Sequence, residues 1–262
     1  MRTLRLTLAY DGSPYCGWQV QPNGITVQQV FAETWKKITQ EDVVPVASGR
    51  TDSGVHALRQ PVMVQTNSKL PNDDLMRALN AELPTSIRVF DVADAAVDFD
   101  PVRQAKRKLY RYVIHDGVVA DVHLGHLAWK VRTRLDLAAM NEAAKRMEGM
   151  HDFRCFESEW PNRASSVRMV YYCRVSRLGD FVSIDVEANG FLYNMVRAIA
   201  GTLAEVGRGI RSPESIDELL GGGDRTQAGP TAPAHALFLV RVDYEGPPGE
   251  SGSAGSNEEG RE

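Results

Sequence analysis

The sequence predicts an α+β fold, in which an antiparallel or mixed sheet carries helices on one face. Two observations favour this class. The strand candidates alternate apolar with polar residues, whereas a buried parallel sheet would show continuous apolar runs. Helix candidates with an apolar face are placed between the strands in both parts of the chain. We therefore expect two similar halves, residues 1–104 and 105–245, followed by a tail, residues 246–262.

The first half is expected to run strand, helix, two strands, helix and strand. Residues 4–10 alternate apolar side chains with polar or small ones until Asp11-Gly12-Ser13-Pro14 breaks the pattern. Thr26 followed by Gln29 forms a capping-box pattern, which predicts that a helix begins there. The other expected elements are strands at residues 43–47, 61–66 and 87–92 and a short helix capped by Asn72 or Asp73.

The second half is expected to begin with a strand at residues 109–114, in which Tyr110 and Tyr112 share one face. Asp136 is positioned to cap a helix, and Gly179-Asp180 to join two strands as a tight hairpin. The other expected elements are strands at residues 169–178, 181–187 and 237–244, helices at residues 191–206 and after Pro213, and a helix-terminal turn at His151-Asp152.

The charge of the chain is unevenly distributed. Its 30 basic and 34 acidic side chains give a net charge of −4, which by itself argues against binding to nucleic acid. The tail, residues 246–262, carries −3 of that charge and leaves the rest of the chain almost neutral. Because the tail consists mainly of Gly, Ser and Glu and has no large apolar side chain, we expect it to be a disordered extension.

Basic residues gather at residues 102–115, where five lysines and arginines and two tyrosines occur without an acid. This mixture of cations and aromatic rings is typical of a surface that neutralises phosphates and stacks on bases. The alternative is a solvated basic strand edge that protects the sheet from aggregation. The charges alone favour neither interpretation.

The composition excludes several other classes of protein. No stretch approaches the roughly 18 apolar residues of a membrane span, and the N-terminus lacks the apolar block of a signal peptide. The cysteines Cys16, Cys155 and Cys173 lack the spacing of a disulfide framework or a zinc ribbon. His123 and His126 have no cluster of further metal ligands beside them. We therefore expect a cytoplasmic protein without a membrane segment or a bound metal.

The segment GRTDSGVHA, residues 49–57, combines turn-forming and reactive residues between two strand candidates. Its glycines permit a sharp turn or a close approach to a ligand. Arg50 and Asp52 are two residues apart and would point to the same side of an extended segment. Together they can grip a phosphate or base while the acid stays ionised and nucleophilic. A surface turn, in which Asp52 bonds its own backbone, explains the same residues.

GRTDSGVHA closely resembles the signature of the TruA family, the tRNA pseudouridine synthases that act on the anticodon arm. Nine residues around a central R-T-D make this a specific match. Only the tail has no counterpart in the family pattern. The resemblance continues in AYDGSPYCGWQVQP at residues 9–22, KLYRY at 108–112, FLYNMVRAIAGTLAEVG at 191–207 and ALFLVRVDY at 236–244.

The resemblance implies the pseudouridine-synthase fold, two ferredoxin-like halves with an RNA cleft between them, usually as a homodimer. It also implies roles for individual residues. Asp52 would be the catalytic aspartate, and Arg50 would fill the space that the target base leaves. Tyr110 would pack against the flipped uracil, Arg197 would pair with the catalytic carboxylate, and Leu237 would line the uracil pocket.

The implied reaction is the isomerisation of uridine to pseudouridine at positions 38, 39 and 40 of the tRNA anticodon stem-loop, with no cofactor. The nucleotide must first leave its stack. Asp52 would then add to the ring or to C1′, or remove a ribose proton, and the sequence is compatible with each route. All routes need an ionised carboxylate, and we expect Arg197 to keep the pKa of Asp52 near its ordinary value.

Two alternative functions are weighed against this one. The first is a related synthase with a different RNA site, because target choice depends on loops outside the signature. The second is an RNA-binding or tRNA-chaperone protein without catalysis, which would keep the basic stretch and the aromatic residues. The presence of Asp52 with Arg50, Tyr110 and Arg197 argues against the second, since a binder gains nothing from an acid beside its phosphate contacts.

Overall fold

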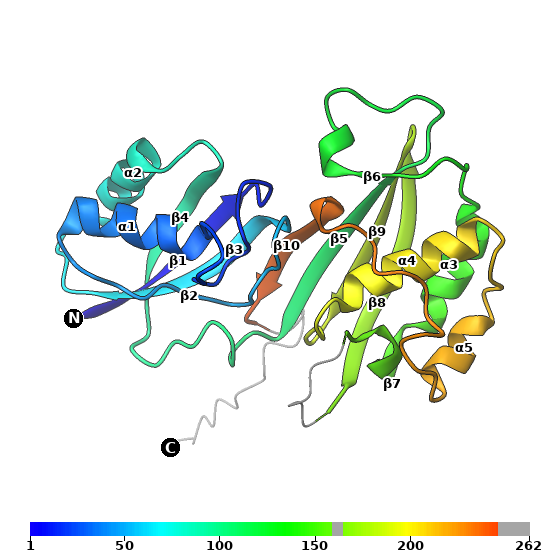
Figure 1. The fold of residues 1–262 in the computed structure, drawn as a ribbon. Helices are drawn as coiled ribbons and strands as arrows, with labels where there is room; N and C mark the ends of the chain where they lie inside the picture. Colours follow the sequence, from blue (N-terminus) through cyan, green and yellow to red (C-terminus); the bar gives the residue numbers. More distant parts are fainter. Residues whose placement is uncertain (159–164, 246–262) are drawn as a thin grey trace, which may run out of the picture.

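The computed structural model describes residues 1–158 and 165–245 of the chain. Figure 1 shows one broad sheet that continues from the first half, at the left, into the second half, at the right. Helices pack on this sheet in both halves, and the predicted α+β class is confirmed. The predicted disorder of the tail, residues 246–262, concerns residues outside those that the structure describes.

The first half folds as a βαββαβ unit. Its first strand lies between the third and the fourth and is antiparallel to both, while the short second strand pairs with the third. This order of strands with two helices is the ferredoxin-like arrangement. The elements are β1 (Arg2–Tyr10), α1 (Val27–Thr39), β2 (Val46–Ala47), β3 (His56–Thr66), α2 (Asn72–Glu82) and β4 (Ile87–Ala95).

The second half repeats this arrangement with additional short elements. Its first strand is antiparallel to the last strand on one side and to the strand before the long helix on the other. The boundary between residues 104 and 105 stays a prediction. The elements are β5 (Arg107–His115), β6 (Trp129–Lys130), α3 (Leu137–Arg146), β7 (Gly149–Asp152), β8 (Val167–Leu178), β9 (Phe181–Ala188), α4 (Met195–Gly207), α5 (Ser215–Leu220), the 3-10 helix η3 (Ala234–Ala236) and β10 (Leu237–Asp243).

Strand β10 joins the two halves in the centre of Figure 1. It is parallel to β3, where Phe238 pairs with His56, and antiparallel to β5. Leu237 and Leu239 share one face of β10. Leu237 packs in the core of the second half and Leu239 in the core of the first, so the helices of both halves cover the same face. Tyr110, opposite Leu239, packs against both cores.

Caps and turns that depend on neighbouring residues are confirmed. The Thr26 hydroxyl accepts a hydrogen bond from the backbone N–H of Gln29 at 3.3 Å, and α1 begins directly after it. Asp136 accepts from two backbone N–H groups at the start of α3. Gly179 has a φ of +60° in the hairpin between β8 and β9. These features are local, which explains why the sequence predicts them.

Several predictions of local structure are wrong. The strand expected at residues 43–47 comprises only Val46–Ala47, and the strand expected at residues 61–66 already begins at His56. The long helix α4 begins at Met195 instead of residue 191, because Asn194 adopts a left-handed backbone with a φ of 61°. Helix α2 has no side-chain cap, since Asn72 is already helical and donates its amide to Asp94. Residues 151 and 152 form no helix-terminal turn and belong to β7, which extends the sheet by antiparallel pairing with β8.

Candidate active site

The Asp52 loop, residues 48–55, connects β2 with β3 and packs against the segment that follows β1. The Thr51 hydroxyl lies 2.8 Å from the Tyr10 hydroxyl, and the Thr51 carbonyl accepts from the N–H of Trp18 at 3.0 Å. The Ser53 hydroxyl donates to the Tyr15 carbonyl at 3.3 Å. These contacts with a separate segment distinguish the loop from an isolated surface turn.

Glycine is required where these two segments meet. A Cβ on Gly12 would lie 2.0 Å from the Val55 carbonyl oxygen, and one on Gly17 would lie 2.6 Å from the Thr51 carbonyl oxygen. Gly17 also has a φ of +82°, a backbone conformation that residues with a side chain rarely adopt. The segment after β1 therefore supports the Asp52 loop by close backbone contact.

Asp52 and Arg197 lie together although they belong to different halves. Arg197 Nη1 is 4.0 Å from Asp52 Oδ2, and the two side chains are 19% and 34% exposed. Burial raises the pKa of Asp52, and the positive charge of Arg197 opposes that rise. The expectation that this pKa stays near its ordinary value is wrong, because desolvation outweighs an ion pair at this distance.

Arg197 is held in place by groups other than Asp52. Its Nε donates to the Ala232 carbonyl at 2.7 Å, and its Nη1 donates to Asn194 Oδ1 at 2.7 Å. The Asn194 amide in turn donates to the Ser158 hydroxyl at 2.9 Å. The position of the guanidinium beside Asp52 is therefore set by the start of α4 and by the backbone before β10.

Tyr110 lies on β5 at the junction of the two cores. Its ring packs edge-to-face on Phe191, with 5.0 Å between the ring centroids. Burial raises the pKa of the Tyr110 hydroxyl, and the negative charge of Asp52 raises it further. Leu237, only 6% exposed, lies in the neighbouring core and pairs across strands with Tyr112.

Arg50 is exposed and stands apart from these residues. No residue in the ranges 1–158 and 165–245 forms a hydrogen bond or an ion pair with the Arg50 side chain. Residues 50–52 belong to no strand, and the loop turns after them at Gly54, which has a φ of +79°. That Arg50 and Asp52 point to the same side stays a prediction. Arg50 is therefore an uncompensated cation on the surface of the Asp52 loop.

The basic stretch is divided between the two faces of β5. On the face without helices, Arg111 forms a bidentate pair with Asp185, both contacts at 2.7 Å, and Arg107 lies 3.3 Å from Glu187. On the helix face, Lys108 donates to the Asp52 loop. Much of the positive charge that the sequence offers to phosphates is therefore already engaged within the protein.

Three residues that hold the Asp52 loop in place were not predicted from the sequence in this role. Lys108 and Gln60 donate to backbone carbonyls at its start. His56, 2% exposed, accepts from the N–H of Gly12 at 3.1 Å and has its Nε2 2.9 Å from the His235 carbonyl. Burial lowers the pKa of His56, so the neutral ring ties the two halves together. Of these three residues, His56 could have been recognised from the sequence, because it lies within GRTDSGVHA.

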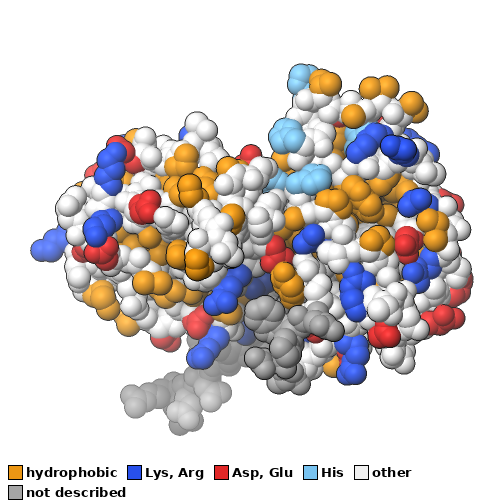
Figure 2. Space-filling view, in the orientation of Figure 1, with side chains coloured by type: hydrophobic (Ala, Val, Ile, Leu, Met, Phe, Trp, Pro, Cys, Tyr) orange, Lys and Arg blue, Asp and Glu red, His pale blue; other side chains and the backbone are white. Residues whose placement is uncertain are grey.

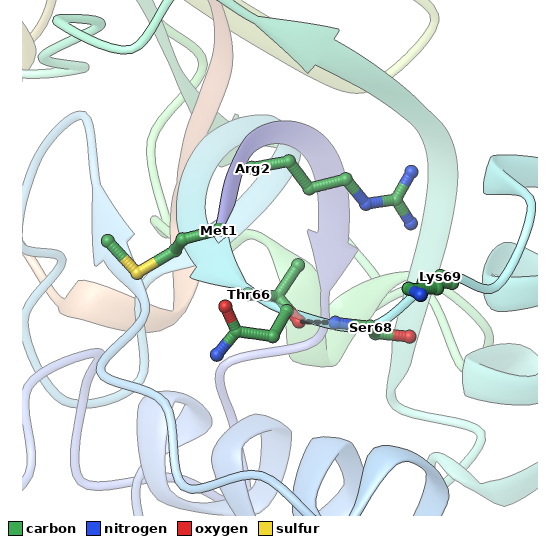
Figure 3. Close-up of a pocket in the computed structure, with 6 residues that line it drawn as sticks. Met1, Arg2, Thr66, Ser68 and Lys69 are labelled. Carbon is green, nitrogen blue, oxygen red and sulfur yellow. Dashed lines mark hydrogen bonds between the residues drawn. The ribbon is translucent and has the colours of Figure 1, made fainter.

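One pocket of the described residues lies away from the Asp52 loop. Figure 3 shows a pocket of about 260 Å³ lined by Met1, Arg2 and residues 66–69. It lies at the far end of β3, and a strand of 11 residues places it roughly 30 Å from the Asp52 loop. Histidines gather beside the notch between the halves at the top of Figure 2.

Residues 1–158 and 165–245 contain neither a candidate metal centre nor a helix that could span a membrane. These ranges contain no group of three His, Cys, Asp or Glu side chains that could hold a metal ion. Within the same ranges, every helix is too short or too polar to cross a bilayer. The three cysteines are free.

Comparison with known proteins places the chain in a family. A family model described as tRNA pseudouridine synthase matches residues 7–102 and 143–245. The chain is 45% identical over 246 residues to tRNA pseudouridine synthase A of Moorella thermoacetica. This alignment covers 93% of this chain and 100% of that protein. It is 43% identical over 244 residues to tRNA pseudouridine synthase A of Geotalea uraniireducens, with the same shares covered. These matches show that the chain belongs to the tRNA pseudouridine synthase family of isomerases.

Proposed function

We propose that the chain converts uridine to pseudouridine at positions 38, 39 and 40 of the tRNA anticodon stem-loop. The observation that carries this proposal is the position of Asp52 beside Arg197 and Tyr110, where the two halves of the sheet meet. These residues come from three distant segments, each of which resembles the family pattern. The names of the relatives support tRNA as the substrate.

The reaction exchanges one glycosidic bond for another. The bond from N1 to the ribose C1′ breaks, the detached uracil turns, and C5 bonds to C1′. The hydrogen on C5 leaves as a proton and N1 gains one, so the composition of the nucleotide is unchanged. No oxidant, reductant or carrier is consumed, and an ionised carboxylate with a shaped pocket is sufficient.

Each side chain has a role that its surroundings support. Asp52 is the catalytic carboxylate. The positive charge of Arg197 favours the ionised form of Asp52 and so opposes the desolvation that raises the pKa of Asp52. Tyr110, held by Phe191, stacks on the extruded uracil, and Leu237 contributes apolar surface to the pocket. Arg50, exposed on the loop, enters the space that the base leaves.

A protein that only binds tRNA is a weaker candidate. Asp52 is desolvated, which disfavours its charged form, and a negative charge facing a polyanion lowers affinity. Both effects are costs for a binder. An enzyme accepts these costs, because carboxylates with a shifted pKa are typical of catalytic sites.

We further propose that the protein acts as a cytoplasmic homodimer. The family resemblance supports the dimer, and Val118, Val119 and Val122, which are 99%, 78% and 87% exposed, offer apolar surface for an interface. The free cysteines are typical of a reducing compartment. Sedimentation velocity should show a dimer, and a monomer at all accessible concentrations would contradict this part of the proposal.

Asp52→Asn tests the function directly. The substitution keeps the size of the side chain and removes its charge, so the release of tritium from uracil C5 in tRNA transcripts should vanish. Transcripts with a single uridine at position 38, 39 or 40 test the site of action. Binding of tRNA should persist or tighten, because repulsion of the phosphates is reduced.

The stability of this variant separates catalysis from turn formation. Because burial raises the pKa of Asp52 in the folded protein, its charge disfavours folding at neutral pH, and removing that charge should not lower the melting temperature. Retained tritium release in Asp52→Asn would refute the catalytic role. Loss of folding would favour the structural turn instead.

A further inference from the structure

We propose that Lys108 is a positioning residue, which ties the Asp52 loop to the strand that carries Tyr110. The inference rests on the proposed function of Asp52 and adds a residue to its machinery. Lys108 lies two residues before Tyr110 on β5, so both side chains project from the helix face of the strand. On β10, Val242 pairs with Lys108 and Leu239 with Tyr110.

The ammonium group of Lys108 contacts the loop just before its functional residues. Nζ donates to the Ser48 carbonyl at 2.7 Å and lies 3.4 Å from the point that a Cβ on Gly49 would occupy. No carboxylate pairs with Lys108 anywhere in the described ranges, and burial lowers its pKa. A desolvated ammonium without a counter-charge is unfavourable for stability. The contact of Lys108 with the Asp52 loop is therefore best explained by its effect on the position of the loop.

Gln60 holds the next carbonyl from the opposite half. Gln60 is fully buried on β3, and its Nε2 donates to the Gly49 carbonyl at 2.6 Å. The Ser48 hydroxyl donates to Gln60 Oε1 at 3.2 Å. Two successive carbonyls directly before Arg50 are thus gripped from β5 and from β3. These strands belong to the second and the first half, so the clamp fixes the loop relative to both.

This arrangement fixes the distance between the catalytic carboxylate and the surface on which the base stacks. Asp52 follows Ser48 by four residues, and Tyr110 follows Lys108 by two. A displacement of about 1 Å between reacting groups can cost about 100-fold in rate. Loss of the Lys108 contact should therefore slow chemistry while leaving most of the tRNA-binding surface intact.

The experiment compares Lys108→Met with Lys130→Met. Methionine has a similar length but neither charge nor donor. Lys130 on β6 is a matched control, because its Nζ donates to the carbonyls of Gly117 and Val131 and its loss removes the same charge. For each variant we would measure the single-turnover rate of tritium release at saturating tRNA, the tRNA dissociation constant and the melting temperature.

We expect Lys108→Met to reduce the rate by about 10- to 100-fold and to change the dissociation constant by less than about threefold. Lys130→Met should keep the wild-type rate, and the melting temperatures show whether both variants are folded at the temperature of the assay. Lys108→Arg, which retains the charge and the donor, should restore most of the rate. If Lys108→Met fails to fold, Lys108→Gln is measured against the same criteria.

Two outcomes would overturn the inference. An unchanged rate at saturation, with weaker binding and a flatter dependence on salt, would make Lys108 a phosphate contact. Equal rate losses in the Lys108 and Lys130 variants would reduce its role to general stability. Asp52→Asn is measured in parallel. If Asp52→Asn retains activity, the proposed function itself fails. If Asp52→Asn is inactive while Lys108→Met is fully active, only the role of Lys108 is rejected.

Discussion

Replacing Arg197 with glutamine should move the acid limb of the pH–rate profile to higher pH. Burial already raises the pKa of Asp52, and the charge of Arg197 opposes that rise. Without this charge the folded protein favours the protonated carboxyl over a wider range of pH, so the ionised fraction falls throughout the limb. Glutamine keeps an N–H donor near the Ala232 carbonyl, while the hydrogen bond from Nη1 to Asn194 Oδ1 is lost together with the charge.

The magnitude follows from the separation of the two groups. Unit charges 4.0 Å apart interact by about 1 kcal/mol in water and by about 4 kcal/mol at an effective dielectric constant of about 20. Because Asp52 is 34% exposed and Arg197 19% exposed, screening by solvent favours a value of about 1–2 kcal/mol. On the acid limb this corresponds to a rate about 5- to 30-fold lower, beyond any loss on the plateau.

The assay is single-turnover release of tritium from uracil C5 at saturating tRNA, from mildly acidic to mildly alkaline pH. Arg225→Gln is the matched control, since Arg225 also donates to a backbone carbonyl of the segment before β10, that of Gly229 at 2.8 Å. Its acid limb should coincide with that of the wild type. If Arg197→Gln lowers the plateau and leaves the limb where it was, Arg197 does not act on Asp52 and the reasoning is refuted.

Two further predictions concern the support of the Asp52 loop and the basic stretch. Gly12→Ala places a Cβ 2.0 Å from the Val55 carbonyl oxygen and should lower the free energy of unfolding by about 1–3 kcal/mol together with the rate. Gly125→Ala, with no atom within 4 Å, should change neither, and equal effects in urea unfolding would contradict the steric argument. Arg111→Gln should leave the slope of log affinity against log salt unchanged, because Asp185 already neutralises Arg111. A flatter slope in tRNA filter binding would show that Arg111 contacts phosphate.

The sequence by itself determined most elements of this fold and their order, although not the short strands β6 and β7. The alternation in residues 4–10 predicts β1, and the caps at Thr26 and Asp136 predict the starts of α1 and α3. These signals are local, because side-chain direction and capping depend on residues a few positions apart. The one long helix that was misplaced begins late because Asn194 adopts a left-handed backbone, and its amide binds Ser158, a residue far away in the sequence.

The candidate residues were also readable from the sequence, through the resemblance of five segments to one family. The resemblance also implied that Arg197 pairs with Asp52, but no local pattern of residues brings these two side chains together. That Asp52 lies 4.0 Å from Arg197 and beside Tyr110 depends on how β10 joins the two halves. The sequence alone also misjudged the pKa of Asp52, since the local pattern contains no measure of how much solvent the folded protein removes.

The basic stretch shows most clearly what only the tertiary structure decided. In the sequence, Arg107, Lys108 and Arg111 are equivalent positive charges. In the sheet, alternation along β5 directs Arg107 and Arg111 to the acids Glu187 and Asp185 on β9, and Lys108 to the carbonyl of Ser48. The meaning of a charge depends on its partner in space, and these partners are brought into contact only when distant strands pair.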